Sequence, residues 1–296
     1  MIDVRKMDVI PKVFQCLAKS RWLQQTKIGD KDEGDDCSIS FLNYDFSLGE
    51  NLQNELANLI FYFDVHRRAL KENDRLAALF AIISAGDLAQ KLSDFFDGLK
   101  EVVLSVMHRD PRFAWPFVPE EYQIPQHLLT TAADALKCMA DLGNAANRDL
   151  LMLWKSPAGK IEVIEKHSVD VIQRTFVELA ESIGVSREEM DNNINENDQI
   201  EWCIEYRYSL GEQLEKDFGR FLFSFEVLRL AILKNDQSAA YVALLDCRLH
   251  SHDISNLFLN IKDEVDKVTV LDKRFSWPVI PNGYQLPEHF PINPRR

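Results

Sequence analysis

The chain has 296 residues, of which 46% are hydrophobic and 27% are charged, and its formal net charge is −13. This composition is typical of a globular protein with a buried core and excludes an intrinsically disordered chain. The acidic balance disfavours nucleic acids and anionic membranes as partners. Its simpler interpretation is that the charge keeps the protein in solution, and the alternative is that it attracts a basic protein surface. Apolar runs stay far below the roughly 20 residues of a membrane span, so we expect none.

The cysteines and the first residues indicate a compartment. The cysteines are odd in number and irregularly spaced, which favours neither a disulfide framework nor a zinc site. They are Cys16, Cys37, Cys138, Cys203 and Cys247. The first residues carry scattered charges and lack the apolar core of a secretory signal. We therefore expect a cytoplasmic protein.

The sequence repeats itself with an offset of 162 positions. The segment RFAWPFVPEEYQIPQH at 112–127 returns as RFSWPVIPNGYQLPEH at 274–289. Between positions 44 and 127, about 31 of 84 residues equal their counterparts 162 positions later, without a gap. This match predicts a tandem duplication of a module of roughly 130 residues, each copy a small domain. We expect a first helical repeat at 1–134, a connecting helix and linker at 135–164, and a second helical repeat at 165–296, and we call the two repeats the first and second halves.

Each half is predicted to open with an amphipathic helix, on which apolar residues such as Val9, Val13 and Leu17 share one face. An acidic stretch that differs between the halves follows. The sequences YDFSLGE at Tyr44 and YRYSLGE at Tyr206 then place a serine three residues before a glutamate, the spacing of a capping box. Leucine and phenylalanine recur behind each box every three, four or seven residues, which predicts a long amphipathic helix.

An Asn-Asp pair then ends each long helix and starts the next one. Asparagine tolerates a left-handed turn, and aspartate is a good N-cap. The pairs are Asn73-Asp74 and Asn235-Asp236. The apolar segments that follow, 75–108 and 237–270, contain no proline, and we expect each to form one broken helix or two helices. Gly86 or Gly98 is the expected break in the first half.

The repeated Trp-Pro segment cannot be a helix interior or a central strand, because three prolines fall within ten residues. We expect an extended strap over the helices of its own half, with Trp115 and Tyr122 buried as pegs, and Trp277 and Tyr284 likewise in the second half. The predicted fold class is therefore all-α, a tandem duplication of a helical module in which each copy is closed by a WP-rich strap.

Two clusters of acidic or histidine residues could suggest a metal site, but the spacing of their residues does not favour one. The acidic run from Asp30 to Asp36 lacks the order of an EF-hand, and its counterpart has lost most of its carboxylates. His250, His252 and Asp253 lie within four residues, where a helix would turn the two imidazoles in divergent directions. We expect no metal, no cofactor and no catalytic residue.

Residues shared by both halves have structural explanations. His127 and His289 each follow a proline at an expected helix start, with no recurring nucleophile beside them, which favours capping or packing over general base catalysis. Arg67 and Arg229 each follow an acid three positions earlier, so we expect ion pairs within one helix. The sequence contains no glycine-rich phosphate-binding loop.

The phrase YSLGE, with Trp202 upstream and a long helix after it, resembles the start of the first helices in two-part all-α immunity proteins that neutralise nucleases of polymorphic toxins. The resemblance covers a short stretch of each half. It implies toxin binding without catalysis, and it carries over no site residue.

The expected function is that of a non-catalytic inhibitor that occludes a partner protein with a basic surface. Whether the chain acts as a monomer or a homo-oligomer stays open. The candidate partner-binding residues are acids of the variable loops, namely Asp30, Asp32, Glu33, Asp35, Asp36, Asp191, Glu196 and Asp198. The alternatives are a structural scaffold subunit and an enzyme at the repeat interface, whose pocket would be lined by shared residues such as Tyr122, His127 and Arg67.

Overall fold

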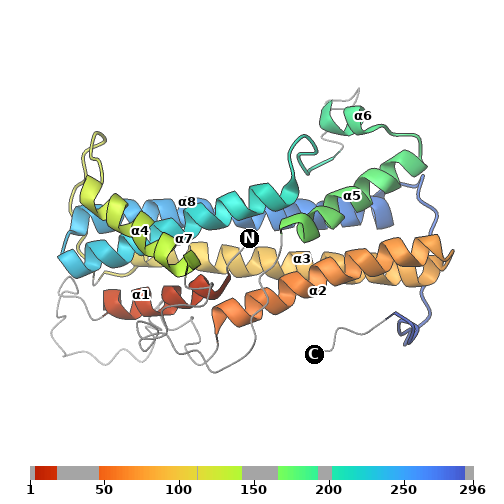
Figure 1. Ribbon diagram of the computed structural model, residues 1–296, viewed down its shortest axis with the longest axis horizontal. Coiled ribbons are helices and arrows are strands. Elements are labelled where there is room, and N and C mark those ends of the chain that lie inside the picture. Colours follow the sequence, from red (N-terminus) through yellow and green to blue (C-terminus); the bar gives the residue numbers. More distant parts are fainter. Residues whose placement is uncertain (1–3, 19–46, 112, 142–165, 193–201, 291–296) are drawn as a thin grey trace.

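The computed structural model describes residues 4–18, 47–111, 113–141, 166–192 and 202–290. This part of the chain is helical and contains no strand, so the predicted all-α class is confirmed. The longest helices run along the long axis of the molecule, and the first helices of the two halves lie toward opposite ends of it (Figure 1). The helices are α1 (Val9–Ala18), α2 (Leu48–Lys71), α3 (Arg75–Leu104), α4 (Gln126–Asp141), α5 (Lys166–Ser182), α6 (Arg187–Asn192), α7 (Leu210–Lys234) and α8 (Gln237–Asp266), with a 3-10 helix η1 (Val4–Asp8) and π-helical turns η3 (Ser105–Arg109) and η5 (Lys267–Leu271).

The predicted serine caps are present at the start of α2 and of α7. Ser47 Oγ accepts a hydrogen bond from the backbone N–H of Glu50 at 3.0 Å, and Ser209 Oγ accepts one from Glu212 at 3.1 Å. Each serine hydroxyl also donates to an aspartate near the first helix of its half, at 2.9 and 2.8 Å. These aspartates are Asp8 and Asp170. They tie the first helix of each half to the start of the next, which the local pattern did not predict.

The Asn-Asp pairs also act as predicted. Asn73 and Asn235 adopt the left-handed turn, with φ of 60° and 56°, and the aspartate after each accepts from a backbone N–H of the following helix. The prediction of a broken third helix is wrong, because α3 and α8 each run unbroken for 30 residues before their π turn.

Gly86 serves close packing and does not end a helix. A Cβ atom at this position would lie 2.8 Å from Cγ1 of Val265, so the missing side chain lets α3 and α8 approach each other. The helix formed by α3 and η3 is long and apolar enough to cross a membrane by length and composition alone, but 61% of its most apolar window is buried. A buried core helix passes the same test, and α2 and α8 cover this one.

The two halves share one hydrophobic core. Phe96 of α3 lies against Phe221 of α7 and stacks on Phe258 of α8, with ring centroids 5.8 and 6.1 Å away. Phe96 and Phe258 are counterparts, as are Ser93 and Ser255, whose hydroxyl oxygens lie 3.0 Å apart. Buried residues of both halves belong to this cluster.

The first helix of each half contacts the opposite half, and α5 also packs on α7 of its own half. Phe14 of α1 contacts Phe225 of α7, with ring centroids 5.9 Å apart, and Phe176 of α5 contacts Phe63 of α2 at 5.5 Å. Each of these contacts is the counterpart of the other. Such reciprocity is the pattern of an isologous interface, in which residue i meets j and j meets i.

Both straps begin with the same anchor. The indole N–H of Trp115 donates to the carbonyl of Val106 at 3.0 Å, and that of Trp277 donates to Val268 at 2.7 Å. Both carbonyls belong to the π turn that precedes the strap. Both tryptophans are half-buried, so the expected pegs are only partly covered.

Beyond this anchor the straps cross to the opposite half, which differs from the expectation that each covers its own. The Trp115 ring lies 5.7 Å from Tyr241 of α8. Tyr284 of the second strap packs on Phe80 of α3 at 5.4 Å, and Phe290 is fully buried beside α2 and α3. Because α3 and α8 lie side by side, the chain that leaves one of them meets the helix pair of the other half.

Candidate functional site

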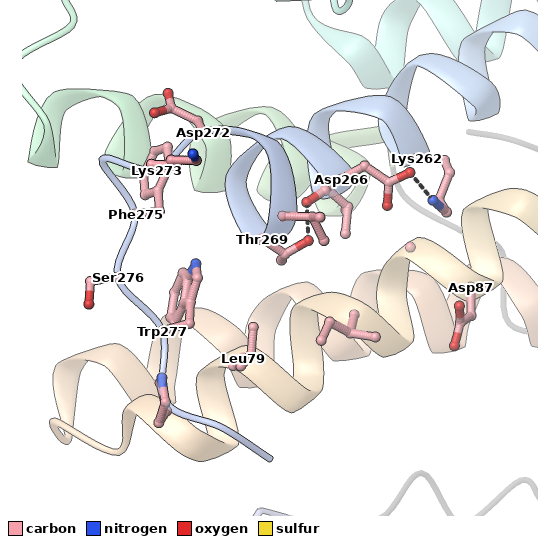
Figure 2. A pocket seen from close by; sticks show the side chains of 15 residues that line it. Leu79, Asp87, Lys262, Asp266, Thr269, Asp272, Lys273, Phe275, Ser276 and Trp277 are labelled. Carbon is pink, nitrogen blue, oxygen red and sulfur yellow. Dashed lines mark hydrogen bonds and ion pairs between the residues drawn. The ribbon is translucent and has the colours of Figure 1, made fainter.

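A groove of about 610 Å³ lies between α3, the end of α8 with η5, and the second strap (Figure 2). Its volume falls within the range of roughly 300–1,000 Å³ found for ligand sites. Leu79 and Ile83 line it from α3, Val265 from α8, and Phe275 and Trp277 from the strap. The groove therefore has walls from both halves, with apolar side chains beside polar and charged ones.

Two of the acids that line the groove are neutralised within the protein. The Lys262 ammonium is paired with the Asp266 carboxylate one turn later on α8. Asp272 accepts from the Arg274 guanidinium at 2.6 Å, and this hydrogen bonding lowers the pKa of Asp272. These pairs leave few charges available to a bound molecule.

The two remaining charges of the groove stand at opposite ends. Asp87 projects from α3, and Lys273 lies where η5 passes into the strap (Figure 2). Within the described residues neither side chain has an ion-pair partner. The groove thus offers a carboxylate at one end and an ammonium at the other, with apolar surface between them.

Trp277 is held on several sides. The guanidinium of Arg75 stacks on its ring at 5.6 Å and donates to the carbonyl of Ser276. His66 lies 5.9 Å away, and its Nδ1 is 2.8 Å from the Ala78 carbonyl oxygen. Burial lowers the pKa of His66 to about 4, so the imidazole beside the strap is neutral at pH 7. The strap wall of the groove is therefore ordered before anything binds.

Counterpart positions explain why there is room here. Leu79 and Gly86 of α3 correspond to Tyr241 and Arg248 of α8. On that side the Tyr241 ring packs against Trp115 at 5.7 Å. The groove beside the second strap is thus the place where Leu79 and Gly86 are smaller than their counterparts, Tyr241 and Arg248.

Apolar side chains continue from the groove onto the surface. Val270 lines the groove and Val279 follows the lining residue Pro278. The exposed fractions are 73% for Val270, 70% for Leu271 and 91% for Val279, and Phe117, the counterpart of Val279 on the first strap, is also 91% exposed. We call Val270, Leu271 and Val279 the apolar rim.

Of the predicted partner-binding acids, the structure describes Asp191. This residue lies on α6 and is half-buried, and its backbone carbonyl accepts from Arg207 at 3.4 Å. One of its carboxylate oxygens is buried. The others lie outside the described residues, namely Asp30, Asp32, Glu33, Asp35, Asp36, Glu196 and Asp198.

The predicted arginine ion pairs differ between the halves. Arg229 pairs within α7 with Glu226 at 2.6 Å, as predicted. The prediction for Arg67 is wrong, since its guanidinium binds Glu178 of α5 through two hydrogen bonds of 2.5 and 2.9 Å, which lowers the pKa of that carboxyl. The counterpart of Glu178 is Cys16, which offers Arg229 no carboxylate. Only the fold brings Arg67 to its partner.

The other shared residues do not meet at the groove. Burial and the nearby Asp236 carboxylate raise the pKa of Tyr122, which lies over the second half. His127 is exposed near the start of α4. His289 Nε2 lies 3.2 Å from Glu72 Oε2 on the first half. Tyr122 and His289 thus contact the opposite half, whereas the side chain of His127 is exposed.

A buried acid on α8 was missed in the sequence. Glu264 is fully buried, and its Oε1 accepts from the backbone N–H groups of Cys203 and Ile204 at 2.6 and 3.2 Å. The hydroxyl of Tyr206 lies 3.3 Å from the same oxygen. Burial raises the pKa of Glu264 to about 7. Its counterpart is Val102, and a glutamate in place of valine on a buried stripe is the signal that could have revealed it.

The histidine cluster on α8 has local partners. His252 Nε2 lies 3.2 Å from Asn256 Nδ2, and His250 Nδ1 lies 3.6 Å from an Asp253 oxygen. Among the residues described, no three His, Cys, Asp or Glu side chains are arranged to hold a metal ion. In comparisons with known proteins, the chain matches no family model, no curated protein and no solved structure.

Proposed function

We propose that this chain is a non-catalytic, acidic, cytoplasmic protein of the immunity or anti-defence type, which blocks a partner protein by covering it. The observation that carries the proposal is the groove beside Trp277 with its apolar rim. Single exposed apolar residues are normal on protein surfaces, but a group of them beside a concave site suits a protein interface, whose centre is depleted in charge and enriched in apolar side chains.

Charge and the placement of shared residues add support. The net charge of −13 steers a basic partner toward the chain. An enzyme at the repeat interface would need shared residues such as Tyr122, His127 and Arg67 in one pocket. Arg67 is engaged with Glu178 instead, and none of the three lines the groove. This placement favours binding over catalysis.

We also infer that the chain arose by tandem duplication and that its two halves, with their WP straps, are related by a pseudo-twofold axis. The support comes from contacts between counterparts, such as Ser93 with Ser255 and Phe96 with Phe258. Residues on a twofold axis meet their own equivalents. A duplicated chain that packs in this way has two related surfaces, one beside each strap, and the groove lies on the surface beside the second strap.

The test is photo-crosslinking in the native cell, with a photoreactive amino acid placed at Val279 or Phe117. The matched control places the same group at Lys216, an exposed residue of α7 away from the straps. We expect one protein to be captured from the strap positions and not from the control. The activity of that protein, once purified, should fall when the wild-type chain is added.

Charged variants then show whether the partner contacts the apolar rim or the acidic stretch of the first half. Val279→Glu should weaken inhibition at least tenfold, because it places a charge on the apolar rim. Charge reversal of Asp32, Asp35 and Asp36 tests the acidic stretch of the first half. The proposed function is refuted if the captured protein keeps full activity with the wild-type chain bound, or if strap and control positions capture the same proteins.

A further inference from the structure

We propose that the groove beside Trp277 binds a short segment of the partner protein that has an aromatic anchor, a basic residue on one side of it and an acidic residue on the other. The inference rests on the proposed function and specifies the chemistry of the partner at this site. Leu79, Asp87, Lys273 and Trp277 are the residues that would recognise the segment.

The dimensions of the groove suit a short peptide. Leu79 and Asp87 stand eight residues apart on one straight helix, which corresponds to about 12 Å at 1.5 Å per residue. An extended chain advances about 3.3 Å per residue, so three or four residues cover this length. A single free amino acid carries its charges too close together to reach both ends.

The charges of the groove define the ends of the segment. Lys262 and Asp266 neutralise each other, and Asp272 is held by Arg274. Asp87 is left to attract a basic side chain at the α3 end. Lys273 attracts an acidic one at the strap end (Figure 2).

The protein itself shows what fits beside the strap tryptophan. On the opposite side Tyr241 of α8 packs its ring against Trp115 at 5.7 Å, with an angle of 48° between the ring planes. Leu79 takes the place of Tyr241 beside Trp277. An aromatic side chain supplied by the partner would occupy the space that the missing tyrosine ring leaves, and aromatic pairs at this distance are favourable.

The wall that receives the anchor needs no rearrangement. The Trp277 indole N–H is already bonded to Val268, and Arg75 covers one part of its ring. A preformed site loses little conformational freedom on binding, so a short segment can bind with useful affinity.

The test uses a random library of 12-residue peptides displayed on phage and selected on the full chain. Leu79→Tyr fills the groove with the side chain that the molecule carries at the counterpart position. Tyr241→Leu is the matched control, since it makes the reverse change on the other side. We expect selected peptides to share an aromatic residue between a basic and an acidic one, and to bind Leu79→Tyr at least tenfold more weakly than the wild type or the control.

Charge variants check the direction of the segment. Asp87→Lys should weaken the selected peptides at least fivefold, and peptides selected on that variant should replace the basic residue by an acidic one. Ile83→Arg also obstructs the groove from a half-exposed position and serves in place of Leu79→Tyr if that variant does not fold.

Three outcomes overturn the inference. The first is a selection that yields no peptide sensitive to Leu79→Tyr or Ile83→Arg. The second is a set of peptides without an aromatic residue, and the third is a set indifferent to Asp87→Lys. If such a result accompanies a partner captured at Val279, the inference fails while the proposed function stands. If the peptides meet all three expectations but the captured partner stays fully active, the groove binds peptides as inferred and the proposed inhibitor function is refuted.

Discussion

Replacing Glu264 by glutamine is expected to remove much of the pH dependence of stability near neutrality. The carboxyl is buried on α8, and burial raises its pKa to about 7 in the folded protein, against an ordinary value of 4.5. Since the folded pKa is the higher one, protonation favours the folded state. The stabilisation is complete below pH 4.5 and is lost as the pH rises through 7.

The size of the effect follows from the two pKa values. The difference corresponds to about 3 kcal/mol between the fully protonated and the fully ionised carboxyl. This is a large share of the 5–15 kcal/mol that typically stabilises a folded protein. The glutamine variant keeps an oxygen to accept from the N–H groups of Cys203 and Ile204, but it cannot ionise.

The assay is urea unfolding at pH 5, 6, 7 and 8, with the free energy of unfolding extrapolated to water. The wild type should lose about 2–3 kcal/mol relative to Glu264→Gln between pH 5 and pH 8. Taking the difference removes the contribution of other acids, such as Asp246 and Asp263, whose pKa values burial also raises. Glu121→Gln, on an exposed strap residue, should leave the wild-type profile unchanged.

Parallel profiles for the wild type and Glu264→Gln would refute the reasoning, because they would mean that the carboxyl has the same pKa in the folded and the unfolded chain. A wild type that gains stability relative to the variant as the pH rises would show that the hydrogen bonds from the 202–206 segment outweigh burial.

Three further predictions concern α2 and α3. Gly86→Ala should lower the free energy of unfolding by about 1–3 kcal/mol through the clash with α8, whereas Gly98→Ala, with nothing within 4 Å, should raise it by about 1 kcal/mol in the same urea assay. Because burial lowers the pKa of His66 to about 4, the wild type should lose about 3 kcal/mol relative to His66→Leu between pH 7 and pH 4, and taking this difference removes the opposite contribution of Glu264. In a double-mutant cycle with alanine, Arg67 and Glu178 should show a coupling of about 0.5–1 kcal/mol that shrinks in 1 M salt, because the carboxylate is half-exposed, and a zero coupling would count against the pair.

The features predicted correctly from the sequence are local ones. Ser47 caps a helix through Glu50, three residues away, and Asn73 turns the chain because asparagine tolerates positive φ. Such features depend on residues within one helical turn, so a short window contains all the information they need. The wrong prediction of a break near Gly86 has the opposite origin, because Val265, far along the chain, decides what that glycine does.

The candidate site was out of reach of the same reasoning. Its walls come from α3 and from the end of α8 with the second strap, two parts of the chain that lie far apart in the sequence. Its two available charges, Asp87 and Lys273, stand out only because the neighbouring Lys262 and Asp266 are already paired. The loop acids chosen from composition, apart from Asp191, lie outside the described residues. The apolar rim carries no motif, since an exposed valine and a buried one look alike in a sequence.

By itself the sequence determined an all-α chain, the places where its long helices start and turn, and the offset that relates its halves. The tertiary structure alone decided which half each strap and each first helix covers. The physical reason is that similar halves present similar surfaces, so Phe14 could pack on the α2 of its own half or on the α7 of the other, and one window of sequence fits both. The close packing of α3 on α8 sets the helix pairs of the two halves side by side, and the groove lies beside that contact.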